Sequence, residues 1–225
     1  IVLVHGALES GIVWYAWVPA LAKEYRVIRP DLPGCGLSSV PAGFDWSFKG
    51  LAAYVASVLD NAGVRSVHIV GAKTGGPIAM QFAADFPERT RSLSVVSGPA
   101  SVIQIENPSP VPQKDRLGSS VSPEMIEYWT AMEKNAPAEG TAGLNQALSG
   151  FDLEKEGVLQ RIKAPSLIVT ADRSALQSVE KVRKYQMAIP NSRLAVVHSD
   201  AYHLAVAKPD ECAAIVLGFI REHAA

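Results

Sequence analysis

The sequence has few cysteines, almost no net charge and no long apolar run, and each shortage excludes a class of protein. Only two cysteines, Cys35 and Cys212, occur in 225 residues, which predicts neither a disulfide framework nor a cysteine metal site, and favours a cytoplasmic location. A formal net charge of −1 gives no electrostatic reason to bind nucleic acid or an anionic membrane. No apolar run reaches the length of a membrane span.

The start of the chain gives one further expectation. No signal peptide is recognisable, but the sequence begins inside an apolar run, IVLVHG. We therefore expect an N-terminal segment to precede Ile1.

What the sequence does have is an ample supply of apolar residues, 48% of the chain, arranged in a regular rhythm. Short apolar runs alternate with segments in which apolar residues recur at helical spacing. Strands that are apolar on both faces and alternate with helices predict a mainly parallel sheet covered by helices on both sides. The expected strands are 1–4, 26–30, 67–70, 92–96, 166–170 and 194–197, and the expected helices are 12–24, 47–61, 75–86, 175–187 and 209–223.

The segment 100–163 breaks this rhythm and shows no clear strand. It contains the proline-rich stretch NPSPVPQ (107–113), whose prolines exclude a regular helix or a central strand. A helix is expected over 122–134, with a serine cap and a proline at its first position. Its apolar side chains favour a lid that packs onto a core formed by 1–99 and 164–225, and the alternative is a long surface excursion. These side chains are Met125, Ile126, Tyr128, Trp129 and Met132.

The stretch HIVGAKTGGPIA (68–79) predicts a strand, a tight turn and a helix in direct succession. Gly71 and Gly75 flank the turn and allow strand and helix to approach each other. Pro77 suits the first helical turn. The apex residue, Lys73, is therefore expected in a strained backbone conformation, with its side chain above the carboxyl end of the sheet, where such sheets bind ligands.

Five stretches together resemble the α/β-hydrolase superfamily, in order and spacing, over essentially the whole chain. They are VHGALES (4–10), RPDLPGCGLSS (29–39), VGAKTGG (70–76), LIVTADRS (167–174) and AYHLAVAKPDE (201–211). The resemblance implies an α/β-hydrolase fold with a short helical lid. It also implies an oxyanion hole formed by the backbone N–H groups of Ala7 and Thr74, and a catalytic role for His203.

Two positions depart from the family pattern. The motif G-x-S-x-G has Lys73 in place of the nucleophilic serine, and the position of the usual acid holds Ser174. Asp172 and Asp200 are alternative acids, although each is more simply explained as an ordinary loop carboxylate. The other acid position of the family, in VVSGPA (95–100), has no carboxylate.

Lysine at this apex has several possible roles. A helix N-terminus and burial under a lid both disfavour an ammonium ion, which predicts a lowered pKa and a neutral amine. Such an amine forms a Schiff base with a carbonyl, or acts as a general acid or base. A charged Lys73 would instead hold a substrate carboxylate or an enolate. In a further alternative, His203 activates water directly.

We therefore expect an enzyme that acts without cofactor or metal on a small or medium, largely apolar carbonyl or ester compound. Lys73, His203 and Ser174 are the candidate catalytic residues, and the chemistry is of hydrolase or lyase type. Candidate pocket residues are Leu8, Tyr128 and Trp129. The alternative is a catalytically inactive pseudo-hydrolase that binds a small ligand in the former active site. No nucleic acid or membrane partner is expected, and the chain is expected to be a monomer or homodimer.

Overall fold

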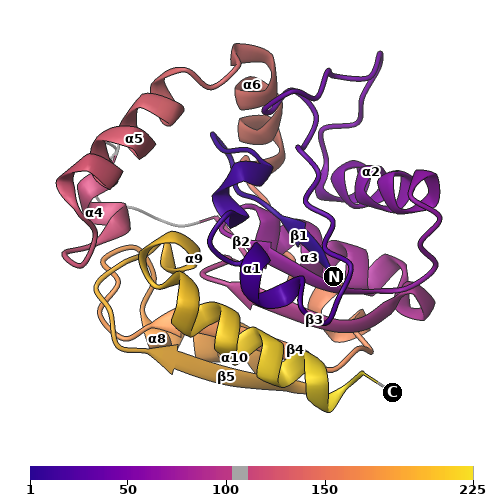
Figure 1. The fold of residues 1–225 in the computed structure, drawn as a ribbon. Coiled ribbons are helices and arrows are strands. Elements are labelled where there is room, and N and C mark those ends of the chain that lie inside the picture. Colours follow the sequence, from indigo (N-terminus) through magenta and orange to yellow (C-terminus); the bar gives the residue numbers. More distant parts are fainter. Residues whose placement is uncertain (103–110, 225) are drawn as a thin grey trace.

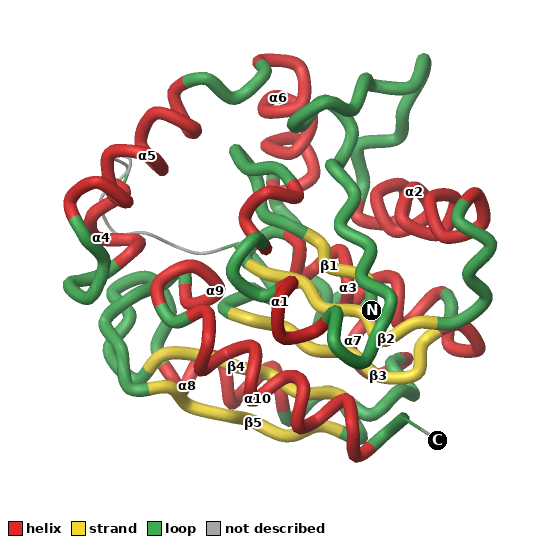
Figure 2. Tube along the Cα trace, in the orientation of Figure 1, coloured by secondary structure: helices red, strands yellow, loops and turns green. Residues whose placement is uncertain are grey.

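The computed structural model describes residues 1–102 and 111–224 and contains a five-stranded sheet (Figures 1 and 2). The strands lie across the sheet in chain order, and every neighbouring pair is parallel. The predicted parallel sheet is therefore confirmed. The strands are β1 (Val2–Val4), β2 (Val67–Ala72), β3 (Thr90–Val96), β4 (Ser166–Ala171) and β5 (Ser192–Val197).

Helices cover both faces of the sheet and divide the core into two layers. Because side chains alternate along a strand, Ile69 of β2 packs into one layer and Val70 into the other. The first layer is closed by α2 (Phe48–Asn61), α3 (Gly75–Asp85), α7 (Val158–Arg161) and α8 (Val179–Gln186). The second is closed by α1 (Val18–Leu21), α9 (Leu204–Ala207) and α10 (Pro209–Glu222).

Two predicted elements differ in the structure, and proline explains both. The expected strand 26–30 is reduced to an isolated bridge between Ile28 and Val2, because Pro30 has no N–H with which to continue the ladder. The expected helix 12–24 is split into a 3₁₀ turn, Gly11–Trp14, and the short α1. Pro19 cannot donate the hydrogen bond that would join them.

The segment between β3 and β4 contributes three further helices, α4 (Gln113–Leu117), α5 (Pro123–Lys134) and α6 (Ala138–Leu148). Figure 1 shows them as an arch on one side of the sheet. The predicted cap of α5 is present, since the Oγ of Ser122 accepts a hydrogen bond from the N–H of Met125. The first part of the proline-rich stretch, 107–110, lies outside the described residues. The assignment of 100–163 as a lid stays a prediction.

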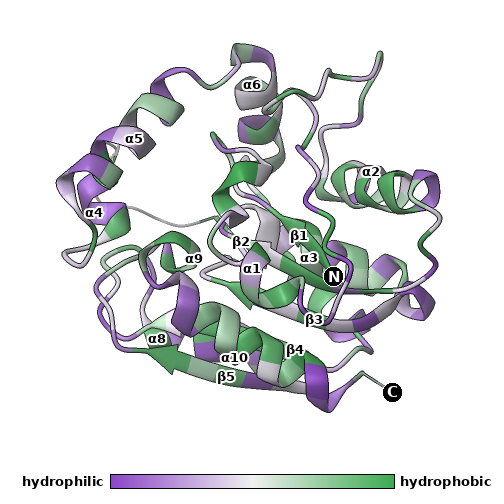
Figure 3. Ribbon diagram, in the orientation of Figure 1, coloured by the Kyte–Doolittle hydropathy of each residue, from purple (hydrophilic) through white to green (hydrophobic). Residues whose placement is uncertain are grey.

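Figure 3 shows the contrast in hydropathy between the apolar strands and the more polar helix α5. Trp129 is buried, whereas its neighbour Tyr128 is half-exposed. Over the described residues, no helix combines the length and the apolar character needed to cross a membrane.

Candidate active site

Lys73 lies at the apex of the tight turn that joins β2 to α3. Its φ is +52°, a left-handed conformation that is strained for any residue with a side chain. The flanking glycines are required by close backbone contacts. A Cβ on Gly71 would lie 2.1 Å from the carbonyl oxygen of Gly75, and a Cβ on Gly75 would lie 2.1 Å from that of Val4. The turn therefore holds Lys73 at the carboxyl end of the sheet.

The side chain of Lys73 ends in a buried ion pair with a residue that the sequence analysis did not select, Glu9. Only 8% of the Lys73 side chain and 3% of the Glu9 side chain are exposed, and Nζ donates a hydrogen bond to Oε1. The same Oε1 lies 2.6 Å from Nε2 of His203. This second contact has ion-pair distance, but Nε2 is not aligned as a hydrogen-bond donor. We refer to these three residues as the Lys73–Glu9–His203 cluster.

The loop that follows β1 is shaped to deliver Glu9 to this position. Oε2 of Glu9 accepts a hydrogen bond from the N–H of Gly6 at 3.0 Å, and a Cβ on Gly6 would lie 2.9 Å from the Cβ of Lys73. Leu8 has a φ of +64°. His5 fixes the loop, because its Nδ1 lies 2.7 Å from the Gly6 carbonyl oxygen and its Nε2 accepts from the N–H of Leu32 at 2.9 Å.

Two cavities meet at the cluster. The first has a volume of about 300 Å³ and is lined by Lys73 and by the backbone-donor residues Ala7 and Thr74. Neither of these two N–H groups has a protein acceptor within 1–102 and 111–224, so both are available to a ligand. The second cavity, of about 200 Å³, is lined by Glu9, and Leu8 lines both. The cluster therefore contacts one cavity through Lys73 and the other through Glu9.

The alpha/beta hydrolase fold family matches residues 1–120. The chain belongs to this family.

Several curated relatives of this α/β-hydrolase-fold chain are hydrolytic enzymes. A pimeloyl-[acyl-carrier protein] methyl ester esterase of Aeromonas hydrophila is 40% identical over 114 residues, which are 50% of this chain and 43% of that protein. The matched part therefore spans less than half of that relative. A poly(3-hydroxyalkanoate) depolymerase of Ectopseudomonas oleovorans is 24% identical over 92% of this chain and 79% of its own length.

Solved structures confirm the α/β-hydrolase fold predicted from the sequence. An esterase from Thermogutta terrifontis superposes with a TM-score of 0.81 at 24% identity, over 99% of this chain and 89% of that one. A hydrolase from Pseudomonas aeruginosa superposes with a TM-score of 0.82 at 26% identity, over 97% and 88% of the two chains.

In this α/β-hydrolase-fold chain, burial and charge set the protonation of the cluster. Burial by itself would raise the pKa of the Glu9 carboxyl, but the attraction of His203 in its protonated form and of Lys73 more than offsets it and holds the pKa below its ordinary range. Burial lowers the pKa of His203, and the attraction of Glu9 only partly compensates. At neutral pH the cluster therefore combines a carboxylate with a neutral imidazole.

The remaining surroundings of His203 come from the segment between β3 and β4. The backbone N–H of His203 donates to the carbonyl oxygen of Arg116 at 2.8 Å. The ring of Trp129 lies 5.4 Å from the imidazole, at an interplanar angle of 63°. Tyr128, the other aromatic pocket candidate, is 50% exposed. Nδ1 of His203 is buried and has no hydrogen-bond partner in the described part of the chain.

The structure places Asp172 and Asp200 in contacts with other loops, and Ser174 in a contact within its own loop. Asp172 accepts hydrogen bonds from the ring of His198 at 2.7 Å and from the N–H of Ser199 at 2.9 Å. Asp200 accepts from the N–H of Ser119 at 3.1 Å. The Oγ of Ser174 accepts from the N–H of Leu176. Outside the gap at 103–110, neither carboxylate nor this hydroxyl contacts His203.

The carboxylate that reaches His203 is thus Glu9, from the first loop of the chain. A signal for it existed in the sequence, since Glu9 is the one acidic residue of VHGALES and shares its loop with Ala7. The family pattern instead places the acid in the loop after β4, where Asp172 and Ser174 lie.

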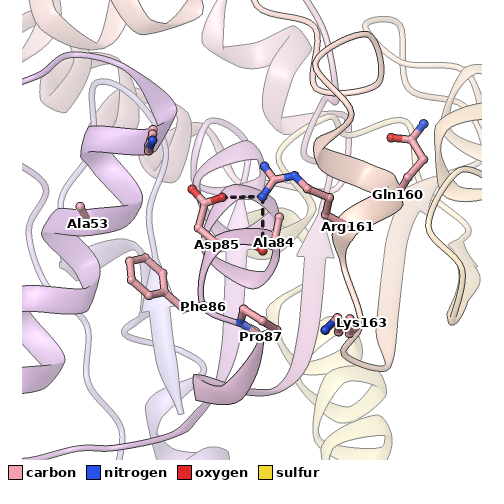
Figure 4. A pocket seen from close by; sticks show the side chains of 9 residues that line it. Ala53, Ala84, Asp85, Phe86, Pro87, Gln160, Arg161 and Lys163 are labelled. Atoms are coloured by element: carbon pink, nitrogen blue, oxygen red, sulfur yellow. Dashed lines mark hydrogen bonds and ion pairs between the residues drawn. The ribbon is translucent and has the colours of Figure 1, made fainter.

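A larger hollow, of about 660 Å³, lies far from this cluster. Figure 4 shows its lining, which includes Asp85 at the last residue of α3 and Arg161 at the last residue of α7. These two side chains form an ion pair at 2.8 Å. Because Lys73 precedes the first residue of α3, the whole length of that helix separates the hollow from the cluster.

Proposed function

We propose that this chain is a cofactor-free hydrolase of small, largely apolar carbonyl or ester compounds. In this proposal the Lys73–Glu9–His203 cluster and the N–H groups of Ala7 and Thr74 replace the usual serine-based triad. The observation that carries the proposal is the buried carboxylate of Glu9, 2.6 Å from His203, beside a cavity with two free backbone donors. Relatives that are esterases and depolymerases support the reaction class.

His203 is the proton acceptor in this scheme. Its imidazole is neutral at neutral pH because burial lowers its pKa, so it accepts a proton from an attacking water molecule. The carboxylate of Glu9 stabilises the imidazolium as it forms, as the aspartate of a triad does, but it faces Nε2 rather than Nδ1. In this scheme Nδ1 is therefore the nitrogen that accepts the proton. His203 is buried and is not among the described lining residues of either cavity. The scheme therefore requires water to reach its ring past Glu9 from the second cavity, whose volume of about 200 Å³ has room for several molecules of roughly 30 Å³ each.

In this proposal two backbone N–H groups and one cation stabilise the carbonyl oxygen of the substrate. The carbonyl oxygen of the substrate accepts hydrogen bonds from Ala7 and Thr74, and negative charge develops on it when water attacks. Lys73 lines the same cavity and adds a positive charge nearby. Its pairing with Glu9 also holds the carboxylate in place.

The alternative use of Lys73 as an imine-forming nucleophile fits the contacts less well. An amine that donates into the carboxylate of Glu9 does not offer its lone pair to a carbonyl carbon. A lysyl amide formed from an ester would also be slow to hydrolyse. We therefore propose hydrolysis, rather than a lyase reaction, as the function of this site.

A panel of short esters, lactones and β-diketones tests the proposal. We expect turnover by the wild type, and a fall of about 10²- to 10⁴-fold in kcat for His203→Gln and for Glu9→Gln. Asp172→Asn and Ser174→Ala are matched controls, and they should change kcat less than threefold if their contacts are only local.

Three outcomes contradict the proposal. Equal activity of Glu9→Gln and wild type would remove Glu9 from the reaction. Trapping of an adduct on Lys73 by borohydride would favour imine chemistry. Saturable binding of panel compounds with no turnover of any of them would favour the pseudo-hydrolase.

A further inference from the structure

We propose that the substrate of this site carries a carboxylate or a similar anionic group, and that Arg116 binds it. This inference rests on the proposed function, because it concerns the same cavity of about 300 Å³, which Arg116 lines together with Lys73. Arg116 is therefore a specificity-determining residue that does not take part in the bond-breaking step.

The position of Arg116 is fixed by two hydrogen bonds. Its carbonyl oxygen accepts from the backbone N–H of His203 at 2.8 Å, which ties α4 to the loop that carries the proposed base. Its Nε donates to the carbonyl oxygen of Val111 at 3.0 Å. The two terminal nitrogens of the guanidinium, which form the fork that binds carboxylates, have no ion-pair partner in 1–102 and 111–224.

The charge balance of the cavity is positive. Its ionisable lining residues are Lys73, Arg116 and Tyr202, and no carboxylate is among the described lining residues. The charge of Lys73 is neutralised by Glu9. Burial raises the pKa of Tyr202, so its hydroxyl stays neutral and supplies no counter-charge. Within 1–102 and 111–224, the charge of Arg116 is left without a compensating carboxylate.

The field of that cation reaches the reaction centre. The positive charge of Arg116 acts to lower the pKa of both His203 and Tyr202, although burial has the larger effect on each. A half-buried cation is partly deprived of water, and a bound anion restores favourable interactions that the solvent no longer provides. The planar guanidinium suits a carboxylate, because two parallel hydrogen bonds form at once.

The remaining lining limits the substrate further. The volume is at the lower end of the range for ligand cavities. The apolar lining residues are Pro99, Leu148, Phe151 and Leu176. The combination points to a short apolar chain with an ester or ketone at one end, held at Ala7 and Thr74, and a carboxylate at the other.

A pair of substrates that differ only in charge tests the inference. The monoethyl and diethyl esters of one short dicarboxylic acid are compared in wild type, Arg116→Gln, Arg116→Lys and Lys114→Gln. Lys114 is the matched control, an exposed cation on the same helix. We expect Arg116→Gln to raise KM for the monoester about 10- to 100-fold, with little change for the diester. Arg116→Lys should retain part of the preference, and Lys114→Gln all of it.

A binding measurement separates this inference from the proposed function. The unesterified dicarboxylate, which cannot be hydrolysed, is titrated into the wild type and Arg116→Gln by calorimetry. Arg116-dependent binding without turnover of either ester would support the anion site and contradict the hydrolase. Equal turnover of both esters, unchanged in Arg116→Gln, would support the hydrolase and overturn the anion site. Circular dichroism confirms that each variant is folded.

Discussion

Oε1 of Glu9 lies 2.6 Å from Nε2 of His203, which joins the first loop of the chain to the loop between β5 and α9. The same oxygen accepts a hydrogen bond from Lys73 at the apex of the turn between β2 and α3. One carboxylate thus connects three segments that are distant in the sequence. Removal of this carboxylate should change both the free energy of unfolding and the turnover, and each can be measured independently of the other.

The first prediction concerns the stability of this ion pair. Glu9→Gln leaves the buried ammonium of Lys73 without its counter-charge, and we expect the free energy of unfolding to fall by about 3 kcal/mol. Lys73→Met combined with Glu9→Gln should recover most of that loss, because no buried charge is then unpaired. Urea denaturation of wild type, single and double variants measures both values. A double variant as unstable as the single one would show that Glu9 stabilises the fold through other contacts.

The second prediction concerns pH. Burial lowers the pKa of His203 below its ordinary value of 6.5. The folded chain then binds fewer protons here than the unfolded chain, so stability is complete above the ordinary value and is lost as the pH falls through the lower, folded value. In His203→Gln the decline below pH 6.5 should be shallower by at most about 1.4 kcal/mol per pH unit.

The same shift has a consequence for turnover. If His203 is the base, the acid limb of kcat/KM should have its midpoint below the ordinary imidazole value of 6.5. His68 provides a comparison for stability alone, because its pKa is lowered to about 4, mainly by burial, and His68 is in β2 rather than in the cluster. An acid limb above the ordinary value would exclude His203 as the base.

The third prediction concerns the close approach at Gly6. A Cβ at this position would lie 2.9 Å from the Cβ of Lys73 and 3.0 Å from Oε2 of Glu9. We expect Gly6→Ala to displace the cluster, with a loss of about 1–3 kcal/mol of stability and of most activity. Gly218→Ala in α10 is the control, because its Cβ would meet nothing within 4 Å, and it should stabilise the helix by about 0.5–1 kcal/mol. Thermal unfolding and an ester assay report both results.

The fourth prediction compares two neighbouring aromatic residues of α5. Trp129 is buried and its ring lies 5.4 Å from that of His203, so Trp129→Ala should cost about 3–5 kcal/mol of stability and reduce kcat. Tyr128 is half-exposed, and Tyr128→Ala should change stability by less than about 1 kcal/mol. Similar effects of the two substitutions would show that α5 is not docked through Trp129.

The fifth prediction tests whether the scaffold supports serine hydrolysis. The N–H groups of Ala7 and Thr74 belong to the backbone and do not depend on the side chain at position 73. Lys73→Ser together with Glu9→Ala and Ser174→Asp should give esterase activity on small activated esters. In the described part of the chain the hydroxyl of Ser174 bonds only to Leu176, so this variant also requires the new carboxylate at position 174 to reach His203. Where it does, omission of Ser174→Asp should lower the activity by on the order of 10⁴-fold, since His203 then lacks an orienting acid.

The control is the variant Lys73→Ser with Ser174→Asp, in which Glu9 is retained. With Glu9 still 2.6 Å from Nε2 of His203, the carboxylate competes with the new serine hydroxyl for the imidazole, and activity should be low. If the variant that keeps Glu9 is as active as the one that lacks it, Glu9 itself orients His203. If all folded variants stay silent, the two backbone donors do not act as an oxyanion hole.

The sequence by itself was sufficient for most of the fold. Glycines at 71 and 75, the apolar runs of β2 and β3, and the serine cap of α5 are local signals, and each produced the element it predicts. Local signals also explain where the prediction was wrong. Pro19 and Pro30 interrupt patterns whose apolar spacing alone suggested a longer helix and a strand.

Only the tertiary structure decided which carboxylate meets His203. The sequence offered Asp172 and Asp200, which are near His203 or in the expected loop, but both are held by backbone and side-chain donors beside them. Glu9 reaches the imidazole because the strained turn at Leu8 and the absence of a Cβ on Gly6 let the first loop pack against the turn that carries Lys73. Such proximity depends on how β1 and β2 pair in the sheet, and distances between loops at the edge of a parallel sheet are not encoded in the spacing of residues along the chain.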